Sequence, residues 1–419
     1  MAPRHAAHGQ AWQGRPGQPG PGDTDCDIAI LGAGLAGLSL AVRLAAPGFA
    51  HLRILVLEAR TDYRRDRTWS GWALRPHPFG GAVASRWDRW AVARPGQAAT
   101  CAAPGLAYES IRSDTFYTLA LDRIRAALHI ELRLGTSANA TEDGDTVILH
   151  LPDGTLRAGL VLDTRPPASL GRHGLAQVFL GQEIRTSRPV FDPGIVTLMD
   201  FRHPGRPGAA DAVHFTYVLP SSPCQALVED TWFLPQGVHP PGAQAAGHRA
   251  ALRAYMAAHH GVDGYDVLFE ETGSLPMDPV FRPSTGRRLL PLGTAGGATR
   301  PSTGYAFGAI QARCDAIAAD LAAGRLPGPG RPRPAMVRMM DRVLLHLLEH
   351  RPDQAPHVFT SLFARCPPAA LVRFLNDAAG PADLAAVAAA IPFLPTTAAA
   401  LRLFAGGLEW PRPATAGKA

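Results

Sequence analysis

Two adjacent acids, Glu229 and Asp230, interrupt an otherwise apolar segment, VLPSSPCQALVEDTWF at 218–233. On a β-strand, neighbouring side chains point to opposite faces, so only one of these acids can face a given cavity. Burial in an apolar cavity raises the pKa of a carboxyl group, because desolvation disfavours its charged form. Such a group can donate a proton near neutral pH. The segment therefore predicts acid catalysis, with an exposed acid pair on an edge strand as the alternative.

A second signal is the glycine-rich run GAGLAG at 32–37, which has the GxGxxG spacing of a dinucleotide-binding turn. Gly32 permits a tight turn, Gly34 lets the backbone approach a pyrophosphate, and Gly37 lets the following helix pack closely against the strand. The N–H groups at the helix N-terminus can then bind phosphates. Glu58 ends the next apolar run, where its carboxylate can accept hydrogen bonds from ribose hydroxyls. The run therefore predicts a dinucleotide cofactor.

The motif alone does not distinguish FAD from NAD. Its place at the start of the predicted fold favours FAD, and so does a second glycine-rich segment, PLGTAGGATRPSTGYAFGAI at 291–310. In that segment Gly293, Thr303 and Gly304 are the candidate cofactor contacts, because glycine allows close backbone approach and a predicted helix N-terminus lies beside them. The alternative is an ordinary connection between a strand and a helix.

The sequence resembles the FAD-dependent lycopene β-cyclases of carotenoid-producing bacteria over nearly all of the chain beyond its first 25 residues. Each matching segment is unspecific by itself, but their order and spacing together are specific. The segments are DIAILGAGLAGLSLAVRL, RTWSGW at 67–72, FLGQEIRTSRPVFDPGIVTLMDF at 179–201, LPSSPCQALVEDTWF, EETGSLPM at 270–277, RPSTGYAF at 300–307 and FTSLFARCPPAALVRFL.

This resemblance implies a redox-neutral cyclisation of lycopene or a related linear carotenoid. A proton adds to the terminal alkene of a ψ-end, the neighbouring double bond attacks the resulting tertiary cation, and loss of a proton gives a β-ring. The family needs reduced FAD although no electrons are consumed, which implies NAD(P)H as the reductant. A flavin-dependent monooxygenase or prenyl reductase, and a non-catalytic flavin- or isoprenoid-binding protein, remain the alternatives.

The resemblance also implies roles for individual residues. Glu229 matches the family's essential acid, and Asp230 matches the second acid of that motif. Trp69 matches a family tryptophan whose ring face can stabilise a carbocation, although simple packing explains a tryptophan there equally well. Glu183 and Asp200 match other family acids, whose roles the resemblance does not fix.

A second acid pair, Glu270 and Glu271, stands in an EET context that also looks like the cyclase motif. The spacing to the glycine-rich segment at 291–310 favours Glu229 over this pair as the acid.

Two positions depart from the family pattern. Family members commonly have histidine where this chain has Arg67 and Arg300. Histidine can shuttle protons near neutral pH, whereas arginine stays charged. If those histidines are catalytic, this chain differs in mechanism or substrate. If they only contact flavin phosphate or ribose, arginine can substitute for them.

Two kinds of element must position these groups. Apolar runs at 27–31, 38–46 and 52–57 predict the strand, helix and strand of one βαβ unit. Later apolar runs predict a hairpin at 146–162, a helix at 302–321 and a series of strands at 177–183, 194–201, 213–219 and 226–233. We expect an α/β fold with a Rossmann-type FAD-binding domain, an inserted substrate domain of mixed or antiparallel sheet, and a helical C-terminal region.

The expected domain boundaries follow from these runs. They are a disordered leader at 1–25, an FAD-binding region at 26–170 with interleaved substrate segments, a substrate domain of mainly antiparallel sheet at 171–285, a return to the FAD-binding domain at 286–323, and C-terminal helices at 335–407.

Composition limits the remaining possibilities. The net charge of +6 favours anionic surfaces such as lipid head groups. The five cysteines include no CxxC pair, so we expect neither a disulfide framework nor a metal site. No signal peptide and no run of 18 apolar residues is present. We expect a cytoplasmic protein without a nucleic-acid partner, in peripheral contact with membrane lipid through apolar segments such as 384–394.

Overall fold

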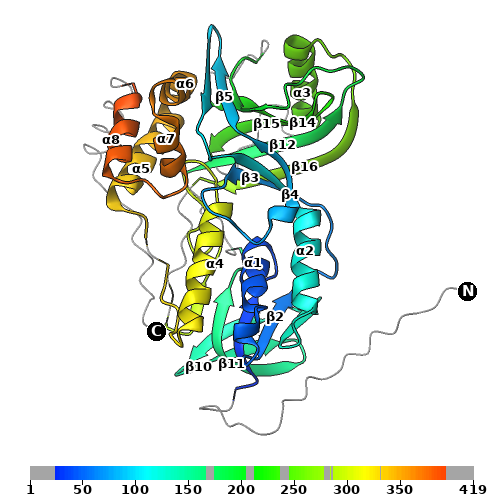
Figure 1. The fold of residues 1–419 in the computed structure, drawn as a ribbon, viewed down its shortest axis with the longest axis vertical. Helices are drawn as coiled ribbons and strands as arrows, with labels where there is room; N and C mark the ends of the chain where they lie inside the picture. Colours follow the sequence, from blue (N-terminus) through cyan, green and yellow to red (C-terminus); the bar gives the residue numbers. More distant parts are fainter. Residues whose placement is uncertain are drawn as a thin grey trace, which may run out of the picture.

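The computed structural model describes residues 24–166, 174–203, 212–235, 245–277, 284, 286–330 and 332–392. Figure 1 shows one sheet with helices α1, α2 and α4 at one end of the molecule, a second sheet with α3 at the other end, and helices α5 to α8 beside the second sheet. The expected leader lies outside the described residues up to residue 23, as does the expected helical region after residue 392.

The first sheet contains the predicted βαβ unit. Its strand order is β8-β2-β1-β11-β10-β9, and β17 pairs with β11. Strands β8, β2, β1, β11 and β17 run parallel, whereas β10 forms antiparallel pairs with β9 and β11. The strands are β1 (Cys26–Leu31), β2 (Ile54–Glu58), β8 (Ile130–Leu134), β9 (Asn139–Asp143), β10 (Thr146–Leu151), β11 (Gly154–Asp163) and β17 (Leu289–Pro291).

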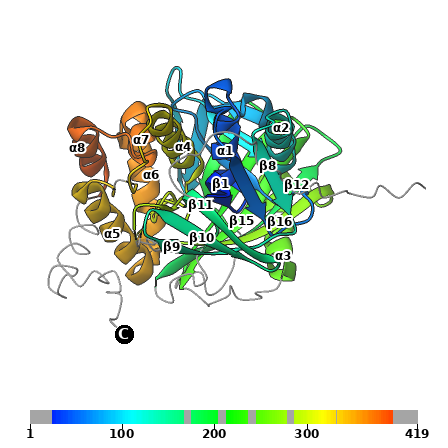
Figure 2. The same cartoon turned by 90° about the horizontal axis from the view of Figure 1, so that it is seen from below.

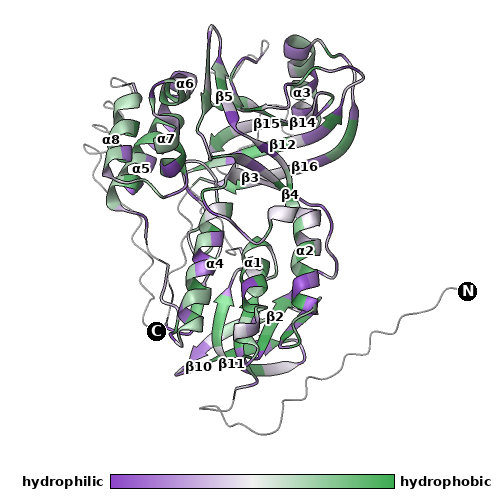
Figure 3. Cartoon of the chain, in the orientation of Figure 1, coloured by the Kyte–Doolittle hydropathy of each residue, from purple (hydrophilic) through white to green (hydrophobic). Residues whose placement is uncertain are grey.

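Helices α1 (Leu35–Leu44), α2 (Ser113–Arg125) and α4 (Phe307–Ala322) cover one face of this sheet. All three contribute to one apolar core with β1 and β2 (Figure 2). Strand β2 is buried over its whole length and is coloured mainly as hydrophobic in Figure 3. Continuous burial of this kind is typical of a parallel strand covered on both faces.

The second sheet has the order β16-β12-β15-β14-β13-β5-β6. Its pairs are antiparallel, except for the parallel pair β13–β5. The strands are β5 (Arg89–Arg94), β6 (Gln97–Ala102), β12 (Leu175–Arg185), β13 (Ile195–Asp200), β14 (Val213–Ser222), β15 (Gln225–Pro235) and β16 (Asp266–Pro276).

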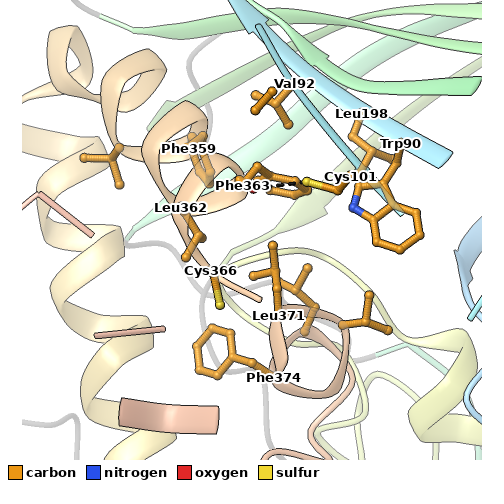
Figure 4. Packing of buried hydrophobic residues seen from close by; sticks show 14 of the residues in the cluster. Trp90, Val92, Cys101, Leu198, Phe359, Leu362, Phe363, Cys366, Leu371 and Phe374 are labelled. Carbon is orange, nitrogen blue, oxygen red and sulfur yellow. Dashed lines mark hydrogen bonds between the residues drawn. The ribbon is translucent and has the colours of Figure 1, made fainter. Parts of the chain in front are cut away.

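Different helices pack on the two faces of the second sheet. Helix α3 (Ala245–His260) covers one face through an apolar core that includes Leu180 and Val228. The C-terminal helices pack against β5, β6 and β13 on the other face, where Phe363 and Leu371 lie near Trp90 and Leu198 (Figure 4). These helices are α5 (Ala335–His350), α6 (Ala355–Arg365), α7 (Pro368–Leu375) and α8 (Pro381–Ala390).

A small third sheet lies between the two large ones. It has the order β3-β7-β4 and consists of β3 (Thr68–Trp72), β7 (Tyr108–Arg112) and β4 (Val83–Trp87). Because side chains alternate along a strand, Trp69 packs into the core of the first sheet, whereas Trp72 packs into the core of the second. The strand β3 therefore contributes side chains to the cores of both large sheets.

The α/β fold class, with its inserted sheet and helical C-terminal region, is confirmed. The hairpin at 146–162 is present as β10 and β11. The helix predicted from Ser302 begins only at Phe307, because Gly304 has a φ of +73° and closes a turn onto the Arg300 carbonyl. Strands β4 to β7 were not predicted individually. Among the described residues, no helix has both the length and the apolar character needed to cross a bilayer.

Candidate active site

Glu229 lies in a row of side chains that crosses four strands of the second sheet. The register pairs Glu229 of β15 with Tyr217 of β14 and with Gly181 of β12, and it pairs Gly181 with Glu271 of β16. Directly opposed residues point to the same face of a sheet. Tyr217, Glu229 and Glu271 therefore share one face, with only a glycine between the two carboxyl groups.

The surroundings of Glu229 favour its protonated form. Burial, together with the nearby charge of Glu271, raises the pKa of Glu229 to about 8. The Thr231 hydroxyl donates a hydrogen bond to Oε1 of Glu229 at 2.8 Å, so Oε2 is the oxygen left to carry a proton. Glu229 therefore has the properties that the sequence predicts for a proton donor near neutral pH.

Asp230 lies on the opposite face of β15, toward helix α3. Its carboxylate is fully buried and accepts hydrogen bonds from His214 Nε2 at 2.6 Å, His248 Nδ1 at 2.7 Å and Trp232 Nε1 at 3.2 Å. Burial opposes ionisation, but the hydrogen bonds from His214 and His248 outweigh it and hold the pKa of Asp230 well below its ordinary value. Asp230 is thus an ionised anchor on the face away from Glu229.

This environment predicts how an Asp230→Asn variant behaves. We expect a free energy of unfolding about 2 kcal/mol lower at pH 7, because the variant loses two charge-assisted hydrogen bonds. The stabilisation by Asp230 is present above the unfolded-state pKa of about 4 and is lost as the pH falls below it. Urea unfolding at several pH values measures this. The difference between the two proteins should shrink in acid, and an equally stable variant at pH 7 would contradict the assignment.

Glu270 and Glu271 have different environments. Glu270 accepts hydrogen bonds from Arg249 Nε and Gln182 Nε2, both at 2.8 Å, and the Arg249 bond lowers its pKa. Glu271 is only 7% exposed, and burial raises its pKa to about 7 against the opposing influence of Thr68. The strand register therefore places Glu271 on the same face as Glu229, with Gly181 between them. The spacing of the two acid pairs in the sequence does not indicate this arrangement.

An apolar pocket adjoins this row of residues. It lies between the second sheet, the segment at 302–305 and the C-terminal helices. Its lining residues are Leu198, Met199, Tyr217, Phe233, Ser302, Thr303, Tyr305, Met340, Asp341, Leu344, Val358, Phe359, Leu362, Phe363, Phe374, Leu375 and Ile391. Tyr217 lies both in the pocket wall and directly opposite Glu229. The acid therefore lies at the edge of a largely apolar space.

Aromatic rings gather beside Glu229, and sequence reasoning missed them. Trp72 contacts the rings of Tyr108 and Tyr305, with centroids 4.8 and 5.8 Å away. Tyr108 and Tyr217 are both close enough to Glu229 for its charge to raise their pKa, in addition to the effect of burial. The cluster of Trp72, Tyr108, Tyr217 and Tyr305 comes from four separate segments, so only the fold reveals it.

Trp69 has a different position from this aromatic cluster. Its ring packs edge-on against Phe116 and Tyr117 of helix α2, with centroids 5.1 and 6.0 Å away. It thus lies on the face of β3 opposite to Thr68 and Trp72. Packing, which was one of the two interpretations of Trp69, accounts for these contacts.

The glycine turn has the geometry that a dinucleotide requires. Gly32 has a φ of +89°, and a Cβ at Gly37 would collide with the Gly32 carbonyl, so both positions need glycine. A Cβ at Gly34 would meet only Arg60 Nη2 at 3.9 Å, so this position is open. Gly34 precedes α1 without a side-chain cap on the first turn. The first N–H groups of α1 are therefore available to an anion.

Glu58 fixes the shape of this turn. Its carboxylate accepts hydrogen bonds from the Ala33 N–H at 2.6 Å and from the Arg60 N–H at 3.0 Å. Burial opposes ionisation of Glu58, but hydrogen bonds from Arg60 and Ala33 lower its pKa. Glu58 is 7% exposed, so its first role is to hold the glycine turn in place.

The N-terminal part of the second glycine-rich segment (291–310) lies against the first glycine-rich run (32–37). Gly293 has a φ of +74°, and a Cβ there would lie 3.0 Å from the Cβ of Ala36 in α1. Thr303 lies farther along, in the wall of the apolar pocket, and Gly304 lies against Gln177 of β12. Gly293 is therefore next to the dinucleotide turn, whereas Thr303 and Gly304 lie where the two halves of the molecule meet.

Neither of the two arginines at family histidine positions contacts the glycine turn. Arg67 is largely exposed and pairs with Asp66 at 3.3 Å. Arg300 is 1% exposed and pairs with Asp341 of α5 at 2.9 Å. Its guanidinium also lies over the ring of Phe374 at 4.1 Å and donates to the Phe374 carbonyl. Arg300 therefore ties the segment at 300–305 to the C-terminal helices.

The remaining family-matched acids are paired with basic groups. Glu183 forms an ion pair with Arg65 at 2.6 Å. Asp200 is fully buried and accepts hydrogen bonds from Arg202 Nη2 and the Tyr255 hydroxyl, both at 2.7 Å. Both acids have satisfied partners, which favours structural roles for them.

In the described part of the chain, three potential metal ligands lie within 4.8 Å of one another: His203, His214 and Asp230. Both carboxylate oxygens of Asp230 already accept hydrogen bonds from histidines. The rings of His203, His214 and Trp232 are stacked at 3.6 and 3.7 Å. These contacts describe a packed polar network rather than an open coordination site.

Comparison with protein families identifies one that spans most of the chain. The model of the family described as "Lycopene cyclase protein" matches residues 27–401. A lycopene beta-cyclase of Paracoccus sp. is 29% identical over 73% of this chain and 75% of that protein. A lycopene beta-cyclase of Pantoea ananas is 26% identical over 70% of this chain and 74% of that protein.

Comparison with solved structures supports the fold. A geranylgeranyl bacteriochlorophyll reductase-like protein of Thermoplasma acidophilum has a TM-score of 0.56 at 14% identity, over 91% of this chain and 98% of that one. A flavoprotein/dehydrogenase of Cytophaga hutchinsonii has a TM-score of 0.57 at 13% identity, over 91% and 100%. The halogenase PltM, solved with phloroglucinol and FAD, has a TM-score of 0.56 at 14% identity, over 91% and 96%. These neighbours share the architecture of flavoproteins.

Proposed function

Because the chain belongs to the lycopene cyclase family, we propose that it is an FAD-dependent enzyme that closes the ψ-ends of lycopene, or of a related linear carotenoid, to β-rings. The observation that carries this proposal is the position of Glu229, a carboxyl group with a raised pKa at the edge of an apolar pocket. A hydrocarbon substrate has no polar group that the protein could hydrogen-bond. A largely apolar pocket with a protonated carboxyl group at its edge matches the chemistry of such a substrate.

Glu229 is the proton donor of the proposed reaction. Its Oε2 proton is transferred to the terminal alkene carbon, so one O–H bond breaks and one C–H bond forms. The adjacent double bond then closes the six-membered ring on the tertiary cation. Loss of a ring proton forms the new double bond, and return of a proton to Glu229 restores the acid. No electrons are gained or lost over the cycle.

The aromatic cluster beside Glu229 can stabilise the cation between these steps. The negative ring face of a tyrosine or tryptophan attracts a cation within about 6 Å of its centroid. Tyr217 and Tyr305 both line the pocket, and burial raises the pKa of Tyr305 to about 12, so its hydroxyl stays neutral at pH 7. We assign cation contact to these two rings. Trp69 and Asp230, the other candidate catalytic residues, support the site from the far faces of β3 and β15.

FAD fits the glycine turn and the residues around it. The uncapped N-terminus of α1, the open position at Gly34 and the close approach of Gly293 leave a backbone-lined space for a pyrophosphate. Gly32 and Gly37 shape that space, and Glu58 secures it. Thr303 and Gly304 are assigned to the flavin side, where they adjoin the pocket. When bound and reduced by NAD(P)H, FAD supplies electron density that can stabilise a nearby cation.

The protein takes its substrate from a membrane surface in this proposal, as a cytoplasmic protein in peripheral contact with lipid. Met336 of α5 is 59% exposed, and Met340 on the same side of that helix lines the pocket. The helix α5 therefore connects an exposed apolar side chain to the pocket interior. The net charge of +6 favours an anionic bilayer.

Expression in lycopene-accumulating bacteria tests the proposed function directly. We expect pigment chromatography to show monocyclic or bicyclic carotenoids in place of lycopene. Unchanged lycopene alongside folded, flavin-loaded protein would overturn the proposal and would favour a flavin- or isoprenoid-binding protein without cyclase activity.

A redox measurement separates the cyclase from a flavin oxidoreductase. We expect the anaerobic, reduced protein to convert many equivalents of lycopene without net loss of NADPH, because ring closure is redox-neutral. The amount of NADPH consumed is compared with the amount of product. Consumption of one NADPH per product would instead identify a monooxygenase or reductase.

A further inference from the structure

Glu271 has no role in the reaction proposed above, yet its charge has the largest influence on the pKa of Glu229 after burial, and it faces the same side of the sheet. A Cβ placed on Gly181 would lie 3.6 Å from Oε2 of Glu229 and 3.4 Å from Cγ of Glu271. Both side chains therefore border one methyl-sized space over Gly181. The oxygen of Glu229 that borders this space is the one not bonded to Thr231.

The carboxyl group of Glu271 is also unusually placed for an acid. It is 93% buried, and its Oε2 makes no hydrogen bond within the described part of the chain. Glu270, the next residue, is fully bonded to Arg249 and Gln182 on the other face. Thr68 favours the charged form of Glu271, but a buried carboxyl oxygen without a hydrogen-bond partner is still costly. This cost argues that the acid is retained for its effect on Glu229 rather than for stability.

We infer that Glu271 is a positioning residue whose charge keeps the proton on Glu229 until substrate is bound, so that the two carboxyl groups hold one proton between them over Gly181. This inference rests on the proposed function. Above pH 7 Glu271 stays ionised through the cycle. The O–H bond of Glu229 breaks in the protonation step and forms again with a proton from water, and water takes up the proton that the ring loses. Atoms and electrons balance without a further reactant.

Two nearby like charges resist joint ionisation, so the pair adds to burial, the larger cause, in keeping Glu229 protonated at neutral pH. The other groups near Glu229 are Thr231 and Asp230 of its own strand, Tyr217 of β14 and Tyr108 of β7. Asp230 also disfavours ionisation of Glu229, but it lies on the other face, where its carboxylate accepts hydrogen bonds from His214 and His248.

The groups facing Glu271 limit its effect. Thr68, Arg65 and Arg67, which precede or begin β3, favour its charged form. Arg65 is shared with Glu183 through their ion pair. Burial raises the pKa of Glu271 to about 7, so Glu271 exerts its full effect on Glu229 only above that pH.

The test is the pH profile of cyclisation for the wild-type protein and the Glu271→Gln variant. Wild-type activity should fall as Glu229 loses its proton, with a midpoint near pH 8. In Glu271→Gln we expect the midpoint to move down by about one pH unit, because a neutral amide no longer opposes ionisation. Rates below pH 6 should stay within about threefold of the wild type, since there the wild-type Glu271 is protonated and as uncharged as the glutamine that replaces it.

Two further variants serve as controls for the loss of the Glu271 charge. Glu270→Gln changes the neighbouring acid on the other face and should leave the midpoint in place. Gly181→Ala retains both carboxyl groups and their charges while it adds an apolar methyl group beside them, so it should not lower the midpoint as Glu271→Gln does. A structural role for Glu271 would reduce the rate at every pH without moving the midpoint.

The carboxyl protonation state can also be measured without substrate. Infrared titration of the protonated-carboxyl C=O band should show a group with a midpoint near pH 8 in the wild type that is absent in Glu229→Gln and shifted down in Glu271→Gln. An unshifted band in Glu271→Gln overturns the inference. Failure of the wild type to cyclise any carotenoid, with the band behaving as expected, would instead overturn the proposed function alone.

Discussion

A Glu229→Gln variant should lose cyclisation by about 10²- to 10⁴-fold, the usual contribution of a positioned general acid, while it keeps its fold and its flavin. Glutamine has nearly the same shape as glutamic acid. Its amide oxygen can still accept the Thr231 hydroxyl that now binds Oε1 of Glu229 at 2.8 Å. What the variant lacks is an acidic proton beside the pocket.

The measurement is product formed per bound flavin, with flavin absorbance and urea unfolding as checks on folding. Glu270→Gln is the matched control, because it makes the same chemical change two strands away, on the opposite face, at an acid bonded to Arg249. It should keep activity. A fully active Glu229→Gln protein would show that another group supplies the proton.

An Arg300→Ala variant should lower the free energy of unfolding by about 3–5 kcal/mol, the usual cost of leaving one member of a buried ion pair alone. Arg300 and Asp341 are 1% and 4% exposed. Removal of the guanidinium leaves the Asp341 carboxylate buried, with the Ser302 hydroxyl at 2.7 Å as its remaining hydrogen-bond partner among the described residues. It also frees the Phe374 carbonyl, and the wall that α5 and α7 give to the pocket should loosen.

Urea unfolding measures the loss, and hydrogen exchange in α5 and α7 locates it. The control is the double variant Arg300→Met/Asp341→Leu, which replaces both charges with apolar groups and should recover most of the stability. Arg300→His is a second comparison, because it introduces the residue that lycopene β-cyclases commonly have at this position. If Arg300→Ala remained stable but lost its flavin, Arg300 would be a cofactor contact instead.

The cofactor half of the fold could be predicted from sequence because its signals are local. The strand, glycine turn and helix at 27–46 are contiguous, and the φ of Gly32 and the tight packing of Gly37 are what the motif requires. Glu58 was expected to contact ribose hydroxyls. In the structure its carboxylate accepts a hydrogen bond from the backbone of the glycine turn.

The site itself could be predicted only in part. Alternation along one strand correctly indicates that Glu229 and Asp230 face opposite sides. It says nothing about which strands flank them. The approach of Glu271 to Glu229 depends on the registers of β12 with β15 and of β12 with β16. Long-range pairings of this kind leave no local pattern in the sequence.

The aromatic residues show the same limit. The family resemblance selects Trp69 as the candidate tryptophan. In the structure it is Trp72, on the other face of the same strand, that packs next to Tyr108 and Tyr305. Likewise, no local pattern reveals that Arg300 pairs with Asp341 of a distant helix. These contacts belong to the packing of three sheets and a helical region against one another.

The most direct test of the central claim, that this chain performs proton chemistry with a flavin that is not consumed, is anaerobic turnover of lycopene by the reduced protein in D₂O. Mass spectrometry of the product and absorbance of the flavin are recorded together. We expect one deuterium in each newly closed ring and a flavin that stays reduced throughout. Cyclic product without deuterium, or flavin oxidised in step with product, would contradict it.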